Sequence, residues 1–161
     1  MIKAAGICIL IFTLLYISSE TVRKKNDALL LCEEFYRFLS HMRLQISCYL
    51  RPADELYLGF ESKALDDIGF IGALKDGCSI GEAYKKAARK ISLPTEVDRV
   101  LLSLFSSLGG SYLEEEIKLI DSHREELSVL LEREREESPK RAKMIRTLSV
   151  AISLGIIIFV I

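Results

Sequence analysis

The stretch Ala28–Tyr49, ALLLCEEFYRFLSHMRLQISCY, decides the fold of this chain. Its apolar residues recur at alternating intervals of four and three, which is the heptad spacing of a helix that buries one face. As a helix, the stretch would be about 33 Å long, at about 1.5 Å per residue. Additional apolar residues widen this face, which favours a helix packed in a bundle over a free coiled coil. The seam residues are Ala28, Cys32, Phe35, Leu39, Met42, Ile46 and Tyr49, and the widening residues are Leu29, Leu30, Leu31 and Phe38.

Two uncharged apolar segments, 4–19 and 147–161, flank the rest of the chain. Each is somewhat short for a hydrocarbon core of about 30 Å, but Lys3 and Arg146 can extend to the interface and lengthen the apolar span. We therefore expect both segments to cross a membrane. The expected organisation is an N-terminal transmembrane helix at 1–19, a cytoplasmic helical bundle at 20–146 and a C-terminal transmembrane helix at 147–161.

Basic residues beside both apolar segments indicate the orientation in the membrane. Arg23, Lys24 and Lys25 follow the first segment, and a second basic cluster at 140–146 precedes the other. Because basic flanks stay on the cytoplasmic side, we expect 20–146 to be cytoplasmic. A cleaved secretory signal peptide is the alternative for the first segment. It would place Ile17 three residues before the cleavage site, where a small residue is needed.

Turn and capping signals divide the middle of the chain into several helices. No stretch alternates with period two, so strands are not expected. The expected fold class is an all-α bundle of about six helices flanked by the two transmembrane helices. We expect a short helix at 52–58 that starts at Pro52, and a second helix at 65–74 that Gly77 stops. The capping box of Ser79 and Glu82 starts the next helix, and Thr95 with Asp98 caps the one after it, which ends at Gly109-Gly110. A last long helix starts at Tyr112, and Pro139 either kinks it or starts a new helix.

The sequence offers little for catalysis. His41 and His123 have no cysteine or carboxylate at metal-ligand spacing. We therefore expect that the protein is not an enzyme and that it has no catalytic residue, metal site or cofactor. Gly69-x-x-Gly72 and Gly77-x-x-x-Gly81 lack the lysine and hydroxyl of a phosphate loop, and we interpret them as helix punctuation. Glu114–Glu116 is interpreted as a solvated acidic first turn. In a reducing compartment, Cys32, Cys48 and Cys78 would be buried free thiols.

Three groups of residues are candidate binding sites. The alternating charges of Glu132, Arg133, Glu134 and Arg135 are a candidate partner-docking site, against the commoner interpretation of a solvated helix face. Lys143 and Arg146 are candidates for the membrane interface. Two pairs of small residues, spaced four apart, would allow close packing of helices in the membrane, unless the spacing is due to chance. They are Ser149 with Ser153 and Ala151 with Gly155.

Three short motifs and the chain length resemble the stage III sporulation protein AB family. The motifs are QISCYLRP at 45–52, LFSSLG at 104–109 ahead of an acidic helix, and KMIRTLS at 143–149 leading into the C-terminal apolar segment. The stretch DGCSIGEA at 76–83 also resembles elements of the platform proteins of type II secretion and type IV pilus machines.

The resemblance implies a non-enzymatic membrane platform of the channel-like complex between mother cell and forespore. Its location would be the mother-cell membrane facing the forespore, with most of the chain cytoplasmic. Its implied partners are a cytoplasmic ATPase like stage III sporulation protein AA, the other membrane components of the complex and membrane lipid. No nucleic acid is expected, and self-association into a homo-oligomer is left open. The alternative function is a membrane-tethered adaptor or sensor that binds a soluble regulatory protein.

Overall fold

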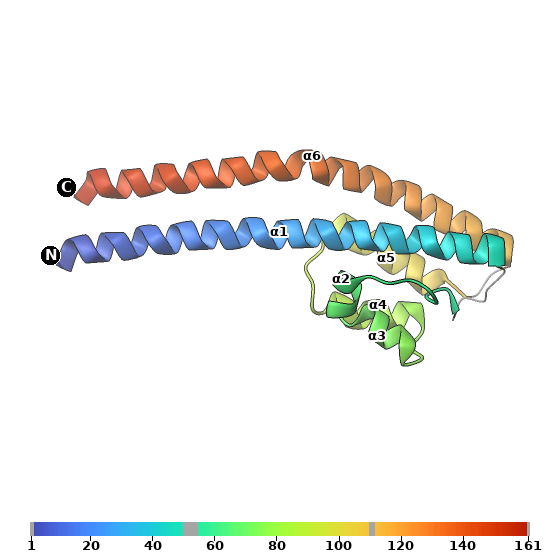
Figure 1. Cartoon of the computed structure of the whole chain (residues 1–161). Coiled ribbons are helices and arrows are strands. Elements are labelled where there is room, and N and C mark those ends of the chain that lie inside the picture. Colours follow the sequence, from blue (N-terminus) through green and yellow to red (C-terminus); the bar gives the residue numbers. More distant parts are fainter. Residues whose placement is uncertain (1, 50–54, 110–111, 161) are drawn as a thin grey trace. The chain divides into compact units, whose positions relative to one another are not determined.

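The structure, a computed structural model, describes residues 2–49, 55–109 and 112–160, without the side chains of 2–11, 14, 154 and 157–160. The described residues form helices and turns and contain no strand. The expected all-α class is therefore confirmed. The described residues contain six helices, labelled in Figure 1: α1 (Ile2–Tyr49), α2 (Lys63–Asp67), α3 (Phe70–Lys75), α4 (Ile80–Ala88), α5 (Thr95–Ser107) and α6 (Leu113–Val160).

The chain divides into two compact units. We call Ala28–Arg133 the helical domain, and Met1–Asp27 with Glu134–Ile161 the helix pair. The domain contains parts of α1 and α6 and all of α2–α5, whereas the helix pair consists of the remaining parts of the two long helices. The helix pair runs antiparallel, because the two chain termini lie at the same end of it (Figure 1).

The predicted heptad seam forms the centre of the helical domain. Five of its residues are buried, whereas Ala28 at one end is half-buried and Tyr49 at the other is exposed. The widening residue Phe38 is also buried, but Leu30 is exposed. The seam is therefore core over about four helical turns. The buried seam residues are Cys32, Phe35, Leu39, Met42 and Ile46.

An ion pair connects the long helices within the helical domain. The Arg43 guanidinium donates to the Asp121 carboxylate at 2.6 Å, and this hydrogen bond raises the pKa of Arg43. Both side chains remain partly exposed, so the ion pair contributes little to stability. We infer that its main effect is to orient the two helices.

The segment between α1 and α4 differs from the prediction. The helix predicted at 52–58 begins outside the described residues, and its described part, 55–58, is a turn in which the Leu58 N–H donates to the Glu55 carbonyl at 3.0 Å. The single helix predicted at 65–74 is wrong, because the structure has two short helices, α2 and α3, there. The break falls at Gly69, whose φ of 82° lies in the left-handed region that glycine adopts without strain.

The predicted cap of α4 is confirmed, whereas the predicted cap of α5 is wrong. The Ser79 hydroxyl accepts the Glu82 N–H at 3.3 Å, as expected for the start of α4. In contrast, α5 begins after Pro94 without a side-chain cap, so the predicted Thr95 and Asp98 cap is wrong. Asp98 instead accepts a hydrogen bond from the buried Tyr84 hydroxyl at 2.5 Å and so ties α5 to α4. Burial, together with this bond, raises the pKa of Tyr84.

Gly81 lies inside α4 and allows close approach of α5, so its interpretation as helix punctuation is wrong. A Cβ atom at this position would lie 2.7 Å from the Phe105 carbonyl oxygen. That oxygen belongs to the backbone and cannot rotate away. We expect Gly81→Ala to lower the free energy of unfolding by about 1–3 kcal/mol, the usual cost of overpacking.

The matched control for this prediction is Gly72→Ala. Gly72 lies in α3, and a Cβ atom at this position would meet nothing within 4 Å. Alanine there should stabilise the helix by about 0.5–1 kcal/mol, because it loses less conformational entropy than glycine on folding. Urea unfolding of both variants checks the pair. Equal stability changes would contradict the close approach at Gly81.

The beginning of α6 is anchored by a buried carboxylate. Glu116 is only 7% exposed, and its side chain accepts the Gly109 N–H at 2.9 Å. The predicted solvated acidic turn is therefore wrong for Glu116, although Glu114 and Glu115 are exposed.

Of the two alternatives for Pro139, the start of a new helix is wrong, since α6 continues through this residue.

Candidate partner-binding sites

The candidate docking residues Glu132–Arg135 lie across the boundary between the helical domain and the helix pair. Arg133 donates to the Glu96 carboxylate of α5, within the domain. Glu134 forms an ion pair with Arg141 at 3.8 Å, within the helix pair. Arg133 and Glu134 thus have partners in the chain itself, Arg135 also makes an interaction, and Glu132 is exposed. Docking of a partner at this segment stays a prediction.

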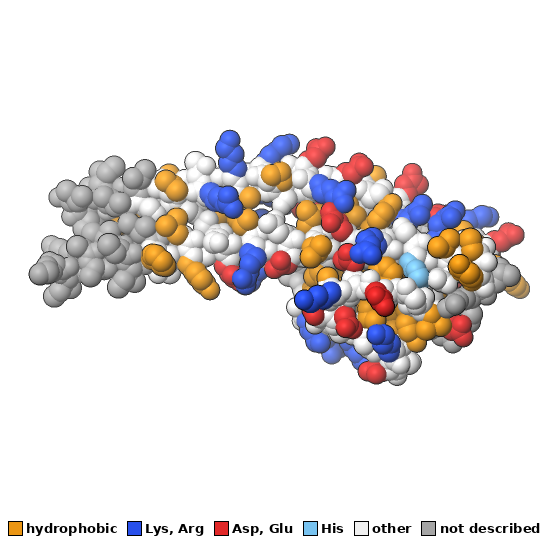
Figure 2. All heavy atoms as spheres, viewed as in Figure 1, with side chains coloured by type: hydrophobic (Ala, Val, Ile, Leu, Met, Phe, Trp, Pro, Cys, Tyr) orange, Lys and Arg blue, Asp and Glu red, His pale blue; other side chains and the backbone are white. Residues whose placement is uncertain are grey.

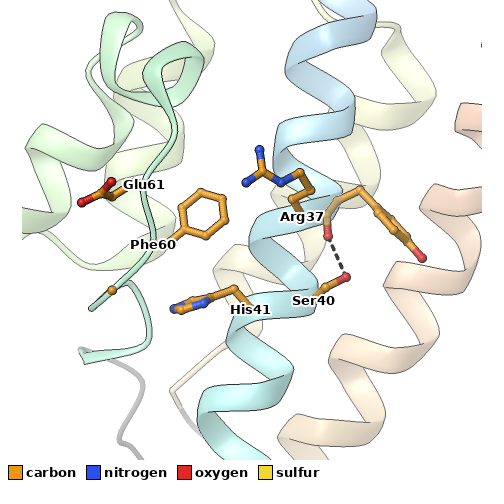
Figure 3. Close-up of a pocket in the computed structure, with 7 residues that line it drawn as sticks. Arg37, Ser40, His41, Phe60 and Glu61 are labelled. Atoms are coloured by element: carbon orange, nitrogen blue, oxygen red, sulfur yellow. Dashed lines mark hydrogen bonds between the residues drawn. The ribbon is translucent and has the colours of Figure 1, made fainter.

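A shallow groove of about 490 Å³ lies beside the domain part of α1 (Figure 3). The Phe60 ring forms one wall. The Arg37 guanidinium carbon lies 5.7 Å from the centre of this ring, and the His41 ring centre lies 5.3 Å from it. Arg37 also bonds to Glu34 at 2.6 Å, and a ring nitrogen of His41 lies 3.1 Å from the Leu58 carbonyl oxygen. These contacts attach the turn after α1 to that helix, and we interpret the groove as a structural joint.

The two histidines are not brought together with other metal ligands. His123 has one ring nitrogen 2.9 Å from the Leu119 carbonyl oxygen, one turn earlier on α6. Over the described residues, no group of three or more histidine, cysteine or carboxylate side chains could hold a metal ion.

The three described cysteines are free thiols with different exposures. Cys32 is buried, as predicted, but Cys48 is exposed and Cys78 is partly exposed. The expectation of three buried thiols is therefore wrong. Lys86 donates to the Cys78 sulfur at 3.0 Å, and this hydrogen bond raises the pKa of Lys86.

The two pairs of small residues on α6 have opposite environments. Ser149 and Ser153 are buried, at 7% exposure each, whereas Ala151 and Gly155 are exposed. The serine hydroxyls donate to carbonyl oxygens of α6 itself, Ser149 to Ile145 at 2.9 Å and Ser153 to Ser149 at 2.8 Å. The candidate interface residues Lys143 and Arg146 are exposed on the same helix. Whether any of them contacts lipid stays a prediction.

Three of the four buried side chains in the described part of the helix pair are serines, and its exposed side chains include apolar residues as well as charged ones such as Arg23, Lys24 and Arg141. Besides Ser149 and Ser153, it buries Ser18 and Val22. Hydrophobic side chains lie on its surface, next to the atoms that are not described (Figure 2). These exposed residues are Phe12, Leu15, Tyr16, Ile17, Met144, Leu148, Val150 and Ile152. Water-soluble helices show the opposite distribution, because burial of apolar surface drives their packing.

A search for membrane-spanning helices gave no candidate. Within the described residues, no helix is both long enough and apolar enough to cross a membrane. The transmembrane helices expected at 1–19 and 147–161 are therefore unsupported by this criterion. Large parts of both segments lie outside the residues with described side chains.

Sequence reasoning missed several residues that organise these surfaces. Tyr84 and Gly81 of α4 contact Asp98 and Phe105 of α5, and neither contact is between residues close together in the sequence. The exposed cations of α4 were visible in the sequence as the run KKAARK at 85–90. The burial of Ser18 had no sequence signal beyond its position in an apolar segment.

Together, these features define an all-α protein in which two long helices contribute both to a helical domain and to a helix pair whose described part buries three serines. The chain belongs to the stage III sporulation protein AB family, whose model matches residues 3–161. It is therefore a sporulation-related protein, and its family is not known as an enzyme family. Comparisons with curated proteins and with solved structures gave no match.

Proposed function

We propose that this protein is a non-enzymatic membrane platform of the sporulation apparatus. The helix pair anchors the chain in the membrane, and the helical domain holds a cytoplasmic ATPase like stage III sporulation protein AA. In this way the protein couples the ATPase to the channel-like complex between mother cell and forespore. Membership in the sporulation family supports a role in sporulation. The anchor is inferred from the chain itself, and the ATPase partner is what the family resemblance implies.

The observation that carries the proposal is the burial of three serines in the described part of the helix pair, which also exposes large apolar side chains. Small and polar residues between helices, with apolar residues outside, are typical of helices surrounded by lipid. Ser18, Ser149 and Ser153 occupy the inside. In the sequence, ICILI at 7–11 and IIIFV at 156–160 extend the apolar stretches beyond the residues whose side chains are described.

The orientation can be tested with a reporter fused after Glu61. The basic residues on both sides of the helical domain predict that this position faces the cytoplasm. A reporter that is active only in the cytoplasm should therefore be active, and alkaline phosphatase at the same position should be inactive. Alkaline phosphatase activity would contradict this topology and would favour a cleaved signal peptide instead.

Docking of the ATPase can be tested by reversing charges in the candidate segment. Because Arg133 bonds to Glu96, the reversal Arg133→Glu is combined with Glu96→Arg, which preserves the ion pair, and with Arg135→Glu. We expect this triple variant to fold but to capture less ATPase in pull-downs at low salt, where such contacts are strongest.

The matched control carries Glu96→Arg and Arg133→Glu alone, so that the comparison isolates Arg135. Equal capture by the wild-type chain and the triple variant would rule out docking through Arg133 and Arg135. Capture of a soluble regulatory protein without any ATPase would favour the membrane-tethered adaptor.

A further inference from the structure

The helical domain carries an exposed basic face at the C-terminal end of α4. We define the basic face as Lys85, Lys86, Arg89 and Lys90, all of which are exposed. Lys85 and Lys86 lie in the last turn of α4, Arg89 is its C-cap, and Lys90 follows in a turn. The opposite side of α4 is buried in the domain core by Ala83, Tyr84 and Ala87. The basic face therefore points away from the domain.

The stability of α4 does not require so many cations on one face. Cations in the last turn do favour the helix through its dipole. However, Lys85 and the C-cap Arg89 are like charges four residues apart, an arrangement that costs about 0.2–0.5 kcal/mol in a helix. Lys86 is stabilised by Cys78 and by the nearby carboxylates of Glu82 and Asp76, but Lys85, Arg89 and Lys90 form no ion pair with another described residue. An external anionic partner would offset this repulsion.

The helical domain also carries an exposed acidic face on α6. We define the acidic face as Glu125, Glu126 and Glu132, which surround Val129. The valine side chain is 63% exposed. No ion pair within the described part of the chain engages the three carboxylates. An apolar centre with a charged rim is the usual composition of a protein–protein contact.

The two faces cannot meet within one domain. Figure 1 shows the domain part of α1 between α6 and α4. The acidic face is on the side of α6 opposite its buried residues Ile120, Leu127 and Leu131, just as the basic face is opposite the buried side of α4. The two surfaces of opposite charge therefore lie on different sides of the domain.

We propose that the acidic face of one chain binds the basic face of a second copy of the same chain. Both halves of the contact are present on one domain, and their charges are complementary. Since the faces lie on different sides, the contact is head-to-tail and can be repeated from copy to copy. A lipid surface would explain the basic face only, and would leave the acidic face and Val129 without a role.

The test uses the full chain in detergent micelles and measures self-association by sedimentation velocity. The basic reversal is Lys85→Glu with Arg89→Glu, and the acidic reversal is Glu125→Lys with Glu126→Lys. We expect each reversal alone to weaken self-association by about tenfold, because it places like charges against each other. The combined variant, with all four substitutions, should restore self-association because the charges again complement each other.

Salt and a matched control complete the test. Wild-type self-association should weaken between about 50 mM and about 500 mM salt, since the Debye length shortens over this range. The control, Lys63→Glu with Lys75→Glu, reverses two exposed lysines outside the basic face and should associate as the wild type does. Circular dichroism verifies that every variant is folded.

Three results would overturn the proposal. The first is a wild-type chain that is monomeric at low salt, and the second is a combined variant that stays dissociated although it is folded. The third is that the basic reversal weakens self-association while the acidic reversal does not, and that the basic reversal also abolishes binding to phosphatidylglycerol vesicles. That last result would assign the basic face to anionic lipid. Glu132 is unchanged in all these variants, and so are the residues of the ATPase docking test.

Discussion

Replacing Phe35 with alanine will lower the free energy of unfolding by about 3–5 kcal/mol, the usual cost of truncating a buried phenylalanine. The Phe35 side chain of α1 is fully buried, and its ring contacts aromatic rings from three other helices. The distances between ring centres are 5.3 Å to Phe70, 5.5 Å to Tyr84 and 6.2 Å to Phe105. The first two contacts are edge-to-face, an arrangement that adds about 0.5–1.5 kcal/mol beyond burial alone.

Denaturant unfolding of the full chain, followed by circular dichroism, measures this effect. The control is Leu30→Ala, five residues earlier on the same helix, where the side chain is 49% exposed. Its expected cost is below about 1 kcal/mol, since about half of this side chain is already in contact with solvent. If the two variants lose the same stability, the aromatic cluster is not the centre of the core.

The second large effect is expected in the helix pair. Ile152 is exposed on α6, between the buried residues Ser149 and Ser153 in sequence. If the helix pair is surrounded by lipid, Ile152→Arg places a charge in hydrocarbon, at a cost of about 2.5–3.5 kcal/mol near the bilayer centre. We therefore expect the variant to be released from membranes by alkaline carbonate, while the wild-type chain stays bound.

The control for this experiment is Met144→Arg. Met144 is also exposed, but it lies among the basic residues that we place at the membrane surface. An added charge there should cost little, because a long side chain near a helix end can reach water. If Ile152→Arg stays bound as firmly as Met144→Arg, the exterior of α6 does not contact lipid. Release of the wild-type chain itself would contradict membrane anchoring altogether.

Local spacing predicted the centre of the fold. The seam from Cys32 to Ile46 and the cap at Ser79 depend on residues close together in the sequence, and both are present in the structure. The errors came from competition between local and distant partners. Asp98 is well placed to cap α5, but it bonds to Tyr84 of α4 instead. Glu116 could have been solvated, but it anchors the Gly109 N–H.

The candidate sites were less predictable than the fold, for the same reason. The charges at 132–135 suggest a free surface in the sequence, yet Arg133 bonds to Glu96, which is distant along the chain. For the pairs of small residues, spacing alone could not tell Ser149 and Ser153, which are buried, from Ala151 and Gly155, which are exposed. Which face of a helix is covered depends on the neighbouring helix, and that neighbour is not encoded in the local pattern.

The buried serines of α6 have a mechanical consequence. Ser149 and Ser153 each donate to a carbonyl of their own helix, so their hydroxyls need no partner on the opposite helix. A displacement of one segment along the other by one turn, about 5.4 Å, would leave both hydrogen bonds intact. The hydrogen bonds of these two hydroxyls therefore do not oppose a shift of one helix along the other, and the register of the helix pair depends on the packing of small side chains.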